Sequence, residues 1–343
     1  MLDDNTVAGF ERHGGRLCVA RALYPQVGAA WIDLSTGINP TAYPAPRATK
    51  QARGRLPEPA ALRELEMTAG AAFGVNATAN VAAVGGTESA VRLLPHVLAV
   101  DKAFVVEPTY ASHSSAWRNS AVASSGVRFE ELPERCDSAT AITIVNPNNP
   151  DGRVVDRATL QHLHDRVARG GGVLIVDEAF ADVDPAISVA DIAGGDSAPR
   201  MVVLRSFGKF FGLAGLRLGF VIAAPPIIQS LRGLLGDWPV CVDAIAAGMR
   251  AYADQSWMTR TREQLRRQAQ RMDGVLSGAG FRIVGGTSLY RLAAAPDAKQ
   301  RFSRLLSQGV LSRPFAHDAT LLRFGLPARG EWNRLSDVMR LSA

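Results

Sequence analysis

The sequence predicts an α/β fold: a large three-layer domain with a mostly parallel sheet, and a smaller α+β domain at the C-terminus. Between residues 81 and 222, short apolar runs of the length of buried strands alternate with helical stretches, which is the pattern of βαβ units. After Pro225-Pro226 the pattern changes to long helices and then to further strands. We therefore expect an N-terminal arm over residues 1–44, a large domain over 45–228 and a small domain over 229–343.

The N-terminal arm and the first helix are predicted from turn residues and periodicity. Residues 1–57 contain many glycines and prolines and little periodicity, which indicates an extended arm with short elements. From residue 58 onward, Leu62, Leu65, Ala69 and Phe73 recur at helical spacing, and Gly74 is well suited to end the helix.

The remaining strands and helices are predicted from apolar runs and capping residues. In the large domain we expect strands at 81–84, 103–106, 142–145, 173–176, 201–204 and 218–222. Helices are expected over 88–98 and over 157–168, the latter with Asp156 as its N-cap. In the small domain we expect helices across about 241–278 and strands at 281–284, 289–292, 310–312 and 321–324.

Composition excludes several classes of protein. With 47% hydrophobic and 20% charged residues, the chain is neither disordered nor fibrous. Its first residues are acidic and no apolar stretch reaches the length of about 18 residues that spans a membrane, so we expect a cytoplasmic protein without a membrane segment. Cys18, Cys136 and Cys241 lack the spacing of a metal site, so we expect a reducing compartment and no bound metal.

The charged residues also carry information. The net charge is +6, and the closest basic cluster, on one expected helix face, comprises Arg260, Arg262, Arg266, Arg267 and Arg271. Because nucleic-acid binding usually needs a denser basic stripe or a known module, we do not expect a nucleic-acid partner. The chain has four lysines, Lys50, Lys102, Lys209 and Lys299, so chemistry that needs an amine has four candidates.

Polar residues follow several of the expected strands, where ligands of parallel α/β sheets bind. Gly86 and Thr87 open a helix after the first strand, an arrangement that favours an anion, although a Gly-Gly turn is also a common structural element. Tyr110 follows the second strand, and Asn149 lies in the loop Asn146–Gly152 after the third. These side chains are expected to meet at one edge of the sheet.

Asp177 and Glu178 end the run Val173–Val176, where an uncompensated buried carboxylate would be costly. A strand followed by Asp-Glu also occurs in nucleoside triphosphatases, but these need a G-x-x-x-x-G-K-S/T loop. The Gly208-Lys209 pair is followed by Phe210 and lacks the first glycine, so a nucleotide site is disfavoured. Asp177 therefore needs a different cationic partner.

The most specific segment is Arg205–Phe220, in which Lys209 lies among apolar and glycine residues. Desolvation there favours the neutral, nucleophilic form of the amine. The segment resembles the motif S-x-S/T-K-x-x-G-L-A-G-x-R-x-G of the fold-type-I class I/II aminotransferase family, and the likeness extends from about residue 30 to the end of the chain. The resemblance implies pyridoxal 5'-phosphate as the cofactor.

The resemblance also implies roles for the residues at the strand ends. Lys209 would carry the cofactor as a Schiff base, and Asp177 would pair with the ring nitrogen and stabilise the ring as an electron sink. Tyr110 would stack on the ring, and Asn149 would hydrogen-bond its phenolic oxygen. The cofactor phosphate would be bound by Gly86, Thr87, Ser206 and Arg217.

Within this family the chain most resembles the L-threonine-O-3-phosphate decarboxylases of cobalamin biosynthesis, which are similar to histidinol-phosphate aminotransferases. The likeness lies in His13–Arg16, Asp33–Pro40, Leu56–Pro59 and Asp177–Phe180. It implies decarboxylation of threonine phosphate to 1-aminopropan-2-ol phosphate by a homodimer. The substrate would be bound by His13, Arg16, Gly37, Asn149 and Arg323.

Three departures from the family pattern move the prediction away from a general aminotransferase. Gly208 replaces a hydroxyl residue, Phe180 replaces a tyrosine that contacts the phenolic oxygen, and Leu56 replaces a tyrosine supplied across the dimer interface. Two alternatives stay open: an aminotransferase of the histidinol-phosphate type, and a cofactor-binding pathway partner without turnover.

Overall fold

The computed structural model describes residues 4–11, 13–28, 31–132 and 140–341, which form two compact units. The large unit comprises Ala42–Asn149 and Arg153–Thr259, and the small unit comprises Met1–Thr41, Pro150–Gly152 and Arg260–Ala343. From the sequence we placed the second boundary after residue 228. The residues that follow it to Thr259 lie in the large unit, because helix α10 (Pro225–Leu235) packs on α5 (Thr87–Val97) and helix α11 (Val242–Ala253) packs on α4 (Pro59–Ala72).

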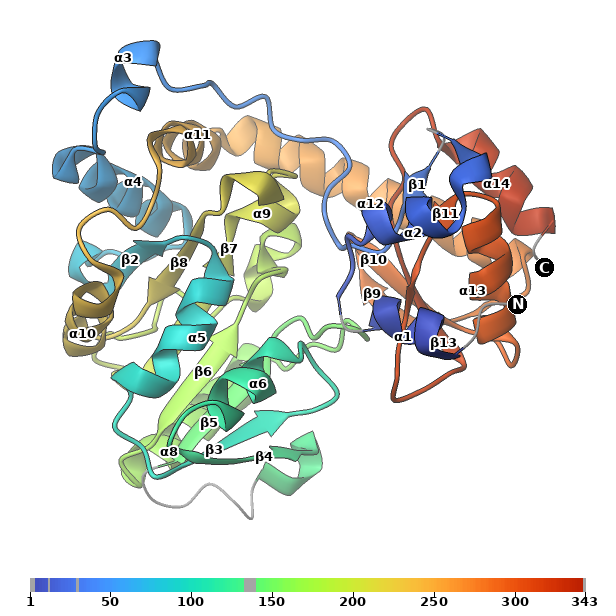
Figure 1. Cartoon of the computed structure of the whole chain (residues 1–343). Helices are drawn as coiled ribbons and strands as arrows, with labels where there is room; N and C mark the ends of the chain where they lie inside the picture. Colours follow the sequence, from blue (N-terminus) through green and yellow to red (C-terminus); the bar gives the residue numbers. More distant parts are fainter. Residues whose placement is uncertain (1–3, 12, 29–30, 133–139, 342–343) are drawn as a thin grey trace. The chain divides into compact units, whose positions relative to one another are not determined.

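A central sheet organises the large unit (Figure 1). Within the described residues it has seven strands in the order β2-β8-β7-β6-β5-β3-β4, and all neighbours are parallel except those of β8. The strands are β2 Val81–Val84, β3 Lys102–Val106, β4 Ala123–Val127, β5 Thr140–Val145, β6 Val173–Asp177, β7 Met201–Ser206 and β8 Gly219–Ile222. The expected mostly parallel sheet is confirmed, and β4 is the strand that the prediction missed.

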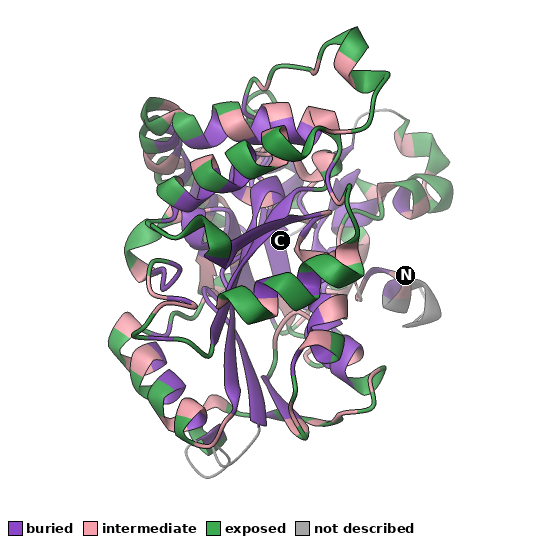
Figure 2. Cartoon of the chain, turned by 90° about the vertical axis from the view of Figure 1, so that its left-hand side faces the viewer, coloured by how far each residue is buried: buried purple, intermediate pink, exposed green. Residues whose placement is uncertain are grey.

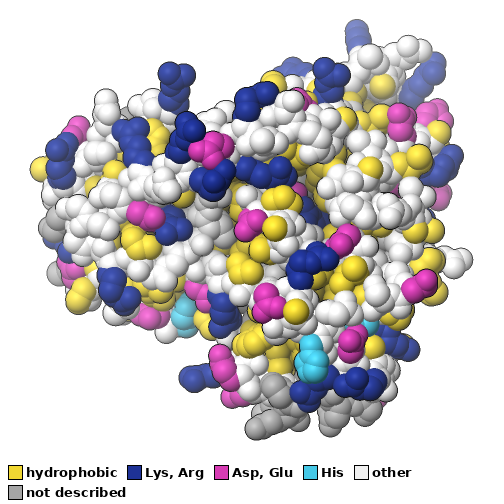
Figure 3. All heavy atoms as spheres, turned by 180° about the vertical axis from the view of Figure 1, so that it is seen from behind, with side chains coloured by type: hydrophobic (Ala, Val, Ile, Leu, Met, Phe, Trp, Pro, Cys, Tyr) yellow, Lys and Arg dark blue, Asp and Glu magenta, His cyan; other side chains and the backbone are white. Residues whose placement is uncertain are grey.

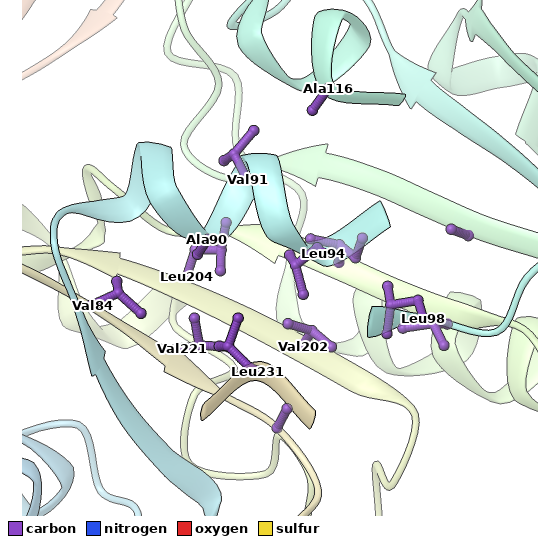
Figure 4. Close-up of a cluster of buried hydrophobic side chains, with 14 of the residues drawn as sticks. Val84, Ala90, Val91, Leu94, Leu98, Ala116, Val202, Leu204, Val221 and Leu231 are labelled. Atoms are coloured by element: carbon purple, nitrogen blue, oxygen red, sulfur yellow. The ribbon is translucent and has the colours of Figure 1, made fainter. Parts of the chain in front are cut away.

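Helices cover both faces of this sheet, as the three-layer prediction requires. On one face, α5, α6 (Ser112–Arg118) and α10 bury apolar side chains against the strands. Leu94 of α5, for example, lies in one cluster with Leu204 of β7 and Val221 of β8 (Figure 4). On the other face, Phe73 at the end of α4 and Tyr252 of α11 contact Phe220 of β8. Apart from the edge strand β4, the strands of the sheet are accordingly among the most buried parts of the large unit (Figure 2).

The predicted helix ends of the large unit are confirmed by their capping contacts. Helix α4 ends as expected before Gly74, whose φ of +78° suits glycine, and Val75 N donates to Gly70 O at 2.8 Å. Asp156 caps α8 (Arg157–Arg169) by accepting a hydrogen bond from Thr159 N at 2.9 Å. Within the described ranges, the large unit also contains the short α-helices α3 (Lys50–Arg53) and α9 (Phe207–Phe210).

In its described part, the small unit contains a four-stranded antiparallel sheet in the order β12-β13-β10-β9 and a parallel pair of β1 and β11. The strands are β1 Ile32–Asp33, β9 Arg282–Thr287, β10 Tyr290–Ala294, β11 Val310–Leu311, β12 Arg313–Pro314 and β13 Leu321–Gly325. The helices are α1 Asp4–Glu11, α2 Leu17–Leu23, α13 Ala298–Ser307 and α14 Trp332–Leu341, and α12 (Gln255–Gly278) enters this unit from the large one. The strand expected at 310–312 is observed as β11, and after Ser312 the chain continues into β12, which belongs to the other sheet.

The surface charges are intermixed. Figure 3 shows lysine and arginine side chains scattered among acidic and apolar ones on one face of the molecule. In the arginine cluster on α12, Arg266 and Arg267 pair with Glu263, and Arg271 lies 4.4 Å from the centre of the Trp332 ring. None of the helices within the described ranges combines the length and the hydropathy of a membrane span.

Candidate active site

Asp177, at the carboxyl end of the central strand β6, is 3% exposed and has two described hydrogen-bond contacts. The backbone N–H of Ala179 donates to its Oδ1 at 3.0 Å, and Nε2 of His113 lies 2.8 Å from its Oδ2. We predicted that this carboxylate needs a partner but did not identify His113. The available signal was its position on α6, three residues after Tyr110 and close to another predicted strand end.

Lys209 lies on α9, the single helical turn that follows β7. Phe207, Phe210 and Phe211, which flank the lysine in sequence, anchor the turn in an aromatic cluster with Tyr43, Tyr252 and Trp257. Phe207 and Phe211 stack with ring centres 4.7 Å apart. The ring described beside the Lys209 amine is Phe180, whose centre is 5.8 Å from Nζ. The large aromatic core thus fixes the backbone that carries the lysine.

The beginning of α5 lies beside the turn that carries Arg217. Gly86 has a φ of +85°, and a Cβ atom built on it would lie 2.6 Å from Arg217 Nη2. A Cβ atom on Gly219 would lie 2.7 Å from Thr87 N, and Gly219 is the register partner of Ser206. The structure therefore brings together the four residues predicted to bind a phosphate. A helix N-terminus with an adjacent guanidinium is well suited to a phosphate group.

Tyr110 is held by α5. Its hydroxyl donates to Glu88 Oε2 at 3.0 Å, and its ring lies edge-on to His113 with centres 6.1 Å apart. Burial raises the pKa of the Tyr110 hydroxyl, as does the nearby Glu88 carboxylate, so the group stays protonated at neutral pH. Tyr110 therefore presents a fixed, neutral aromatic ring next to the residues that contact Asp177.

Asparagine side chains shape the loop between β5 and α8. Asn146 exchanges two hydrogen bonds with the backbone of Val155, at 2.8 and 3.1 Å. Asn148 accepts from Thr109 Oγ1 at 2.7 Å and donates to Pro108 O at 3.0 Å, which ties this loop to the one that carries Tyr110. The side chains of Asn146 and Asn148 are thus held by contacts within the protein, and Asn149, next to Asn148, is 7% exposed.

Two arginines lie side by side in the small unit. Arg323 of β13 is 3% exposed, donates to Ser35 O at 2.8 Å and lies 5.0 Å from the centre of the Tyr290 ring. Its register partner on β12 is Arg313, which is also buried. Burial and the like charge of Arg313 lower the pKa of Arg323. Sequence reasoning missed Arg313, because the register that pairs it with Arg323 is a tertiary property.

The N-terminal residues predicted to bind substrate are attached to the same unit. Gly15 N donates to Ser35 Oγ at 2.7 Å, and a Cβ atom on Gly14 would lie 2.2 Å from Ser35 O, so His13 and Arg16 flank a close backbone contact. Gly325 N donates to Leu34 O at 2.6 Å, which joins this segment to the strand of Arg323. Gly37 is buried, whereas Arg16 is exposed. His13 and Arg323 are therefore tied to the same short stretch of chain.

The described cysteines are free, and the described residues contain no cluster of possible metal ligands. Cys18 and Cys241 are free and exposed, and Cys136 lies outside the described residues. Among the residues with described positions, no group of three or more His, Cys, Asp or Glu side chains could hold a metal ion.

Comparison with known proteins identifies the family. Residues 29–336 match aminotransferase class I and II. A threonine-phosphate decarboxylase of Pseudomonas aeruginosa is 38% identical over 328 residues, which is 95% of this chain and 96% of that protein. A threonine-phosphate decarboxylase of a Sinorhizobium species is 35% identical over 95% of this chain and 97% of its own length.

Solved structures show the same fold. The crystal structure of histidinol-phosphate aminotransferase from Sinorhizobium meliloti, in complex with pyridoxal-5'-phosphate, has a TM-score of 0.80 at 18% identity and covers 94% of this chain and 95% of that one. The α/β architecture and the family resemblance predicted from the sequence are confirmed. The chain belongs to the aminotransferase class I and II family.

Proposed function

We propose that this protein is a pyridoxal-phosphate-dependent decarboxylase that converts L-threonine O-3-phosphate to CO2 and (R)-1-aminopropan-2-ol O-2-phosphate, the linker of the cobalamin nucleotide loop. The observation that carries the proposal is near full-length similarity to two threonine-phosphate decarboxylases, at 35% and 38% identity. In the reaction the bond from Cα to the carboxylate breaks, CO2 leaves and a proton is added to Cα.

The residues of the large unit fit the cofactor. Asp177 offers a buried carboxylate, held in place by His113 and Ala179, to a protonated ring nitrogen. Gly86 leaves open the space beside Arg217 that a Cβ atom would fill, as a phosphate cradle requires. We assign the phosphate to Gly86, Thr87, Ser206 and Arg217, the ring face to Tyr110, the phenolic oxygen to Asn149 and covalent attachment to Lys209.

The chemistry is divided between the cofactor and the protein. When bound, pyridoxal phosphate supplies a cationic ring that withdraws electrons from the bond being broken. Asp177 would stabilise the positive charge on the ring nitrogen, and its buried position would make that charge interaction stronger than it is in water. We assign to the Lys209 amine the transfer of the proton to Cα.

The residues of the small unit supply positive charge for an anionic substrate. We assign the substrate carboxylate to Arg323, which is buried beside a second guanidinium, that of Arg313. We assign the substrate phosphate to His13 and Arg16, with Gly37 and Asn149 as further substrate contacts. An Arg–carboxylate hydrogen bond of this kind contributes about 1.5–3 kcal/mol.

Two assays on the purified protein test this function. The first incubates the protein with carboxyl-labelled L-threonine phosphate: release of labelled CO2 supports the proposal, whereas a keto acid with aminated cofactor would identify an aminotransferase. Failure of both products, with cofactor bound, would favour the non-catalytic pathway partner. The second reduces the protein with borohydride and maps the adduct, which is expected on Lys209 and not on Lys50, Lys102 or Lys299.

We also propose that the protein acts in the cytoplasm as a homodimer. The large unit exposes large apolar side chains, including Leu56 at 63%, Leu234 at 53% and Trp238 at 54%. Pro239, which follows Trp238, lies beside the turn before the phosphate cradle, since a Cβ atom on Gly85 would be 3.3 Å from Pro239 O. Sedimentation velocity should show a dimer that Trp238→Arg weakens, and a monomer at all concentrations would contradict this.

A further inference from the structure

Arg205, a buried arginine that the reaction does not use, bridges two buried carboxylates. Its Nη1 donates to Glu178 Oε2 at 2.9 Å and to Ser188 Oγ at 3.1 Å, and its Nη2 contacts Asp182 Oδ1. The guanidinium carbon lies 4.7 Å from the centre of the Phe73 ring. Arg205 is 3% exposed and Asp182 is 3% exposed, so this is an interior cluster rather than a surface ion pair.

Glu178 is the most constrained member of the cluster. It is fully buried, its Oε1 accepts from Val189 N at 2.6 Å, and its Oε2 accepts from Ser188 Oγ as well as from Arg205. Its backbone N–H donates to Leu204 O at 2.9 Å and so continues the ladder between β6 and β7 beyond the last strand residue. Glu178 therefore joins these two strands by its backbone and by its side chain.

The cluster and the side chains of the cofactor residues lie on opposite faces of the sheet. Asp177 is the register partner of Leu204, so Asp177, Leu204 and Ser206 point to the same face of the sheet. Leu204 packs in the apolar cluster beneath α5 (Figure 4). Arg205 instead packs against Phe73 at the end of α4, on the opposite face. Asp177 and Ser206 are thus each adjacent in sequence to a member of the cluster, Glu178 and Arg205 respectively. The side chains of these two neighbours are held on the opposite face of the sheet.

Stability alone is a weak reason for such a cluster. Buried ion pairs can often be replaced by apolar side chains at no cost in stability, because desolvation offsets much of the attraction between the charges. Here burial raises the pKa of Glu178, whereas Arg205 stays charged: burial disfavours its charge, but the Asp182 and Glu178 carboxylates outweigh that effect and raise its pKa. What the cluster supplies in addition is fixed geometry between the ends of β6 and β7.

We propose that Arg205 is a positioning residue: through Glu178 and Asp182 it holds the carboxyl ends of β6 and β7 at a fixed offset, and thereby keeps Asp177 and Lys209 in their places toward the cofactor. The inference rests on the proposed function, because it assumes that pyridoxal phosphate binds these two residues. A displacement of about 1 Å at reacting groups costs up to about 100-fold in rate.

The test compares Arg205→Met with a control at another arginine that pairs with a buried carboxylate, Arg232→Met. Arg232 pairs with the buried Glu66 at 2.7 Å and also donates to Val81 O, but it lies away from the strand ends that carry the site. The readouts on cofactor-loaded protein are the pH midpoint of the visible absorbance, the dissociation constant of pyridoxal phosphate, and Tm. We expect Arg205→Met to shift the midpoint and to weaken cofactor binding about tenfold or more. The control should lower Tm without either effect, and Arg205→Lys should recover part of the loss.

A purely structural role would overturn the proposal. In that case Arg205→Met would lower Tm while its absorbance midpoint and cofactor affinity match those of the control. If Arg205→Met does not fold, Glu178→Gln is measured in its place and should show the same shift, and an unshifted midpoint in that variant equally overturns the proposal. Failure of the cofactor assignment on which the inference rests is distinguishable, because the wild type would then form no borohydride-stable adduct at Lys209, and failure of the decarboxylase function alone would appear as a keto acid in place of CO2.

Discussion

The imidazole Nε2 of His113 lies 2.8 Å from Oδ2 of Asp177, and both side chains are at most 5% exposed. His113 comes from the first turn of α6 and Asp177 from the end of β6, so the contact joins two elements that are far apart in sequence. Together with Ala179 N on the other oxygen, the histidine holds the carboxylate in one orientation. The carboxylate that we propose as the partner of the ring nitrogen is thus held in one orientation by contacts within the protein.

Replacing His113 tests how far this contact stabilises the protein. His113→Phe keeps an aromatic ring but removes the polar contact to a buried carboxylate oxygen, which should lower the free energy of unfolding by about 1–3 kcal/mol. His113→Gln, which retains a donor, should lose less. Urea unfolding of the cofactor-free variants measures both values. Equal stability of His113→Phe and the wild type would show that the contact is energetically unimportant.

Gly208, which stands where the family pattern has a hydroxyl residue, lies close to the backbone of Ala214. A Cβ atom at position 208 would lie 2.7 Å from Ala214 Cα and 3.2 Å from Ala214 Cβ. Gly208→Ser should therefore displace the turn that carries Lys209 and lower stability by about 1–3 kcal/mol, the usual cost of overpacking. Gly215→Ser is the matched control, because nothing lies within 4 Å of its Cβ position. Thermal unfolding and borohydride trapping compare the two, and a harmless Gly208→Ser would refute the steric account.

The strand ends could be predicted from sequence, because buried parallel strands appear as apolar runs and their last residues meet at one edge. The partners of those residues could not. His113 reaches Asp177 across 64 positions of sequence, and Arg313 reaches Arg323 through the register of two strands. Such contacts depend on how helices and strands pack, which local patterns do not encode.

Strand β4 and the phenylalanines near Lys209 show the same limit of prediction from local sequence patterns. Strand β4 is an edge strand with four of its five residues not buried, so the sequence ASSGV has no apolar run to find. The rings of Phe207 and Phe211 are buried, and distant segments contribute Tyr43 and Trp257 to their surroundings. Burial could be predicted from composition, whereas the direction of each ring could not.

Arg323 should control substrate affinity without affecting the cofactor. Arg323→Leu removes the guanidinium assigned to the substrate carboxylate and should weaken threonine phosphate binding by about 10- to 100-fold, from a loss of about 1.5–3 kcal/mol. Trapping of the cofactor at Lys209 should be unchanged. The control is Arg291→Leu on the neighbouring strand β10, whose partner is Asp273 at 2.6 Å. Spectral titration with substrate measures affinity, and an equal effect in both variants would contradict the assignment.

The buried Glu66 should make stability depend on pH. Burial raises its pKa above 4.5, although Ala83 N and Arg232 act in the opposite direction. A raised pKa means that the folded state binds the proton more tightly than the unfolded state, so the contribution of Glu66 to stability falls as pH rises from about 4.5 through the raised value. The stability of Glu66→Gln relative to the wild type should therefore increase over that range and then level off. Unfolding free energies between pH 4 and 8 test this, with the exposed Glu64→Gln as control, and a constant difference would contradict it.

Lys209→Arg separates covalent attachment of the cofactor from its binding. A guanidinium keeps the positive charge but is effectively never deprotonated, so it cannot form the Schiff base. We expect no borohydride-stable adduct and a fall in activity of at least about 10²–10⁴-fold, the contribution of a positioned acid or base. Reversible binding should persist, because the N-terminus of α5 and Asp177 are unchanged. Lys50→Arg, on the exposed α3, should behave as the wild type. Mass spectrometry of the reduced protein decides the point: an adduct retained by Lys209→Arg at another lysine would assign the attachment elsewhere.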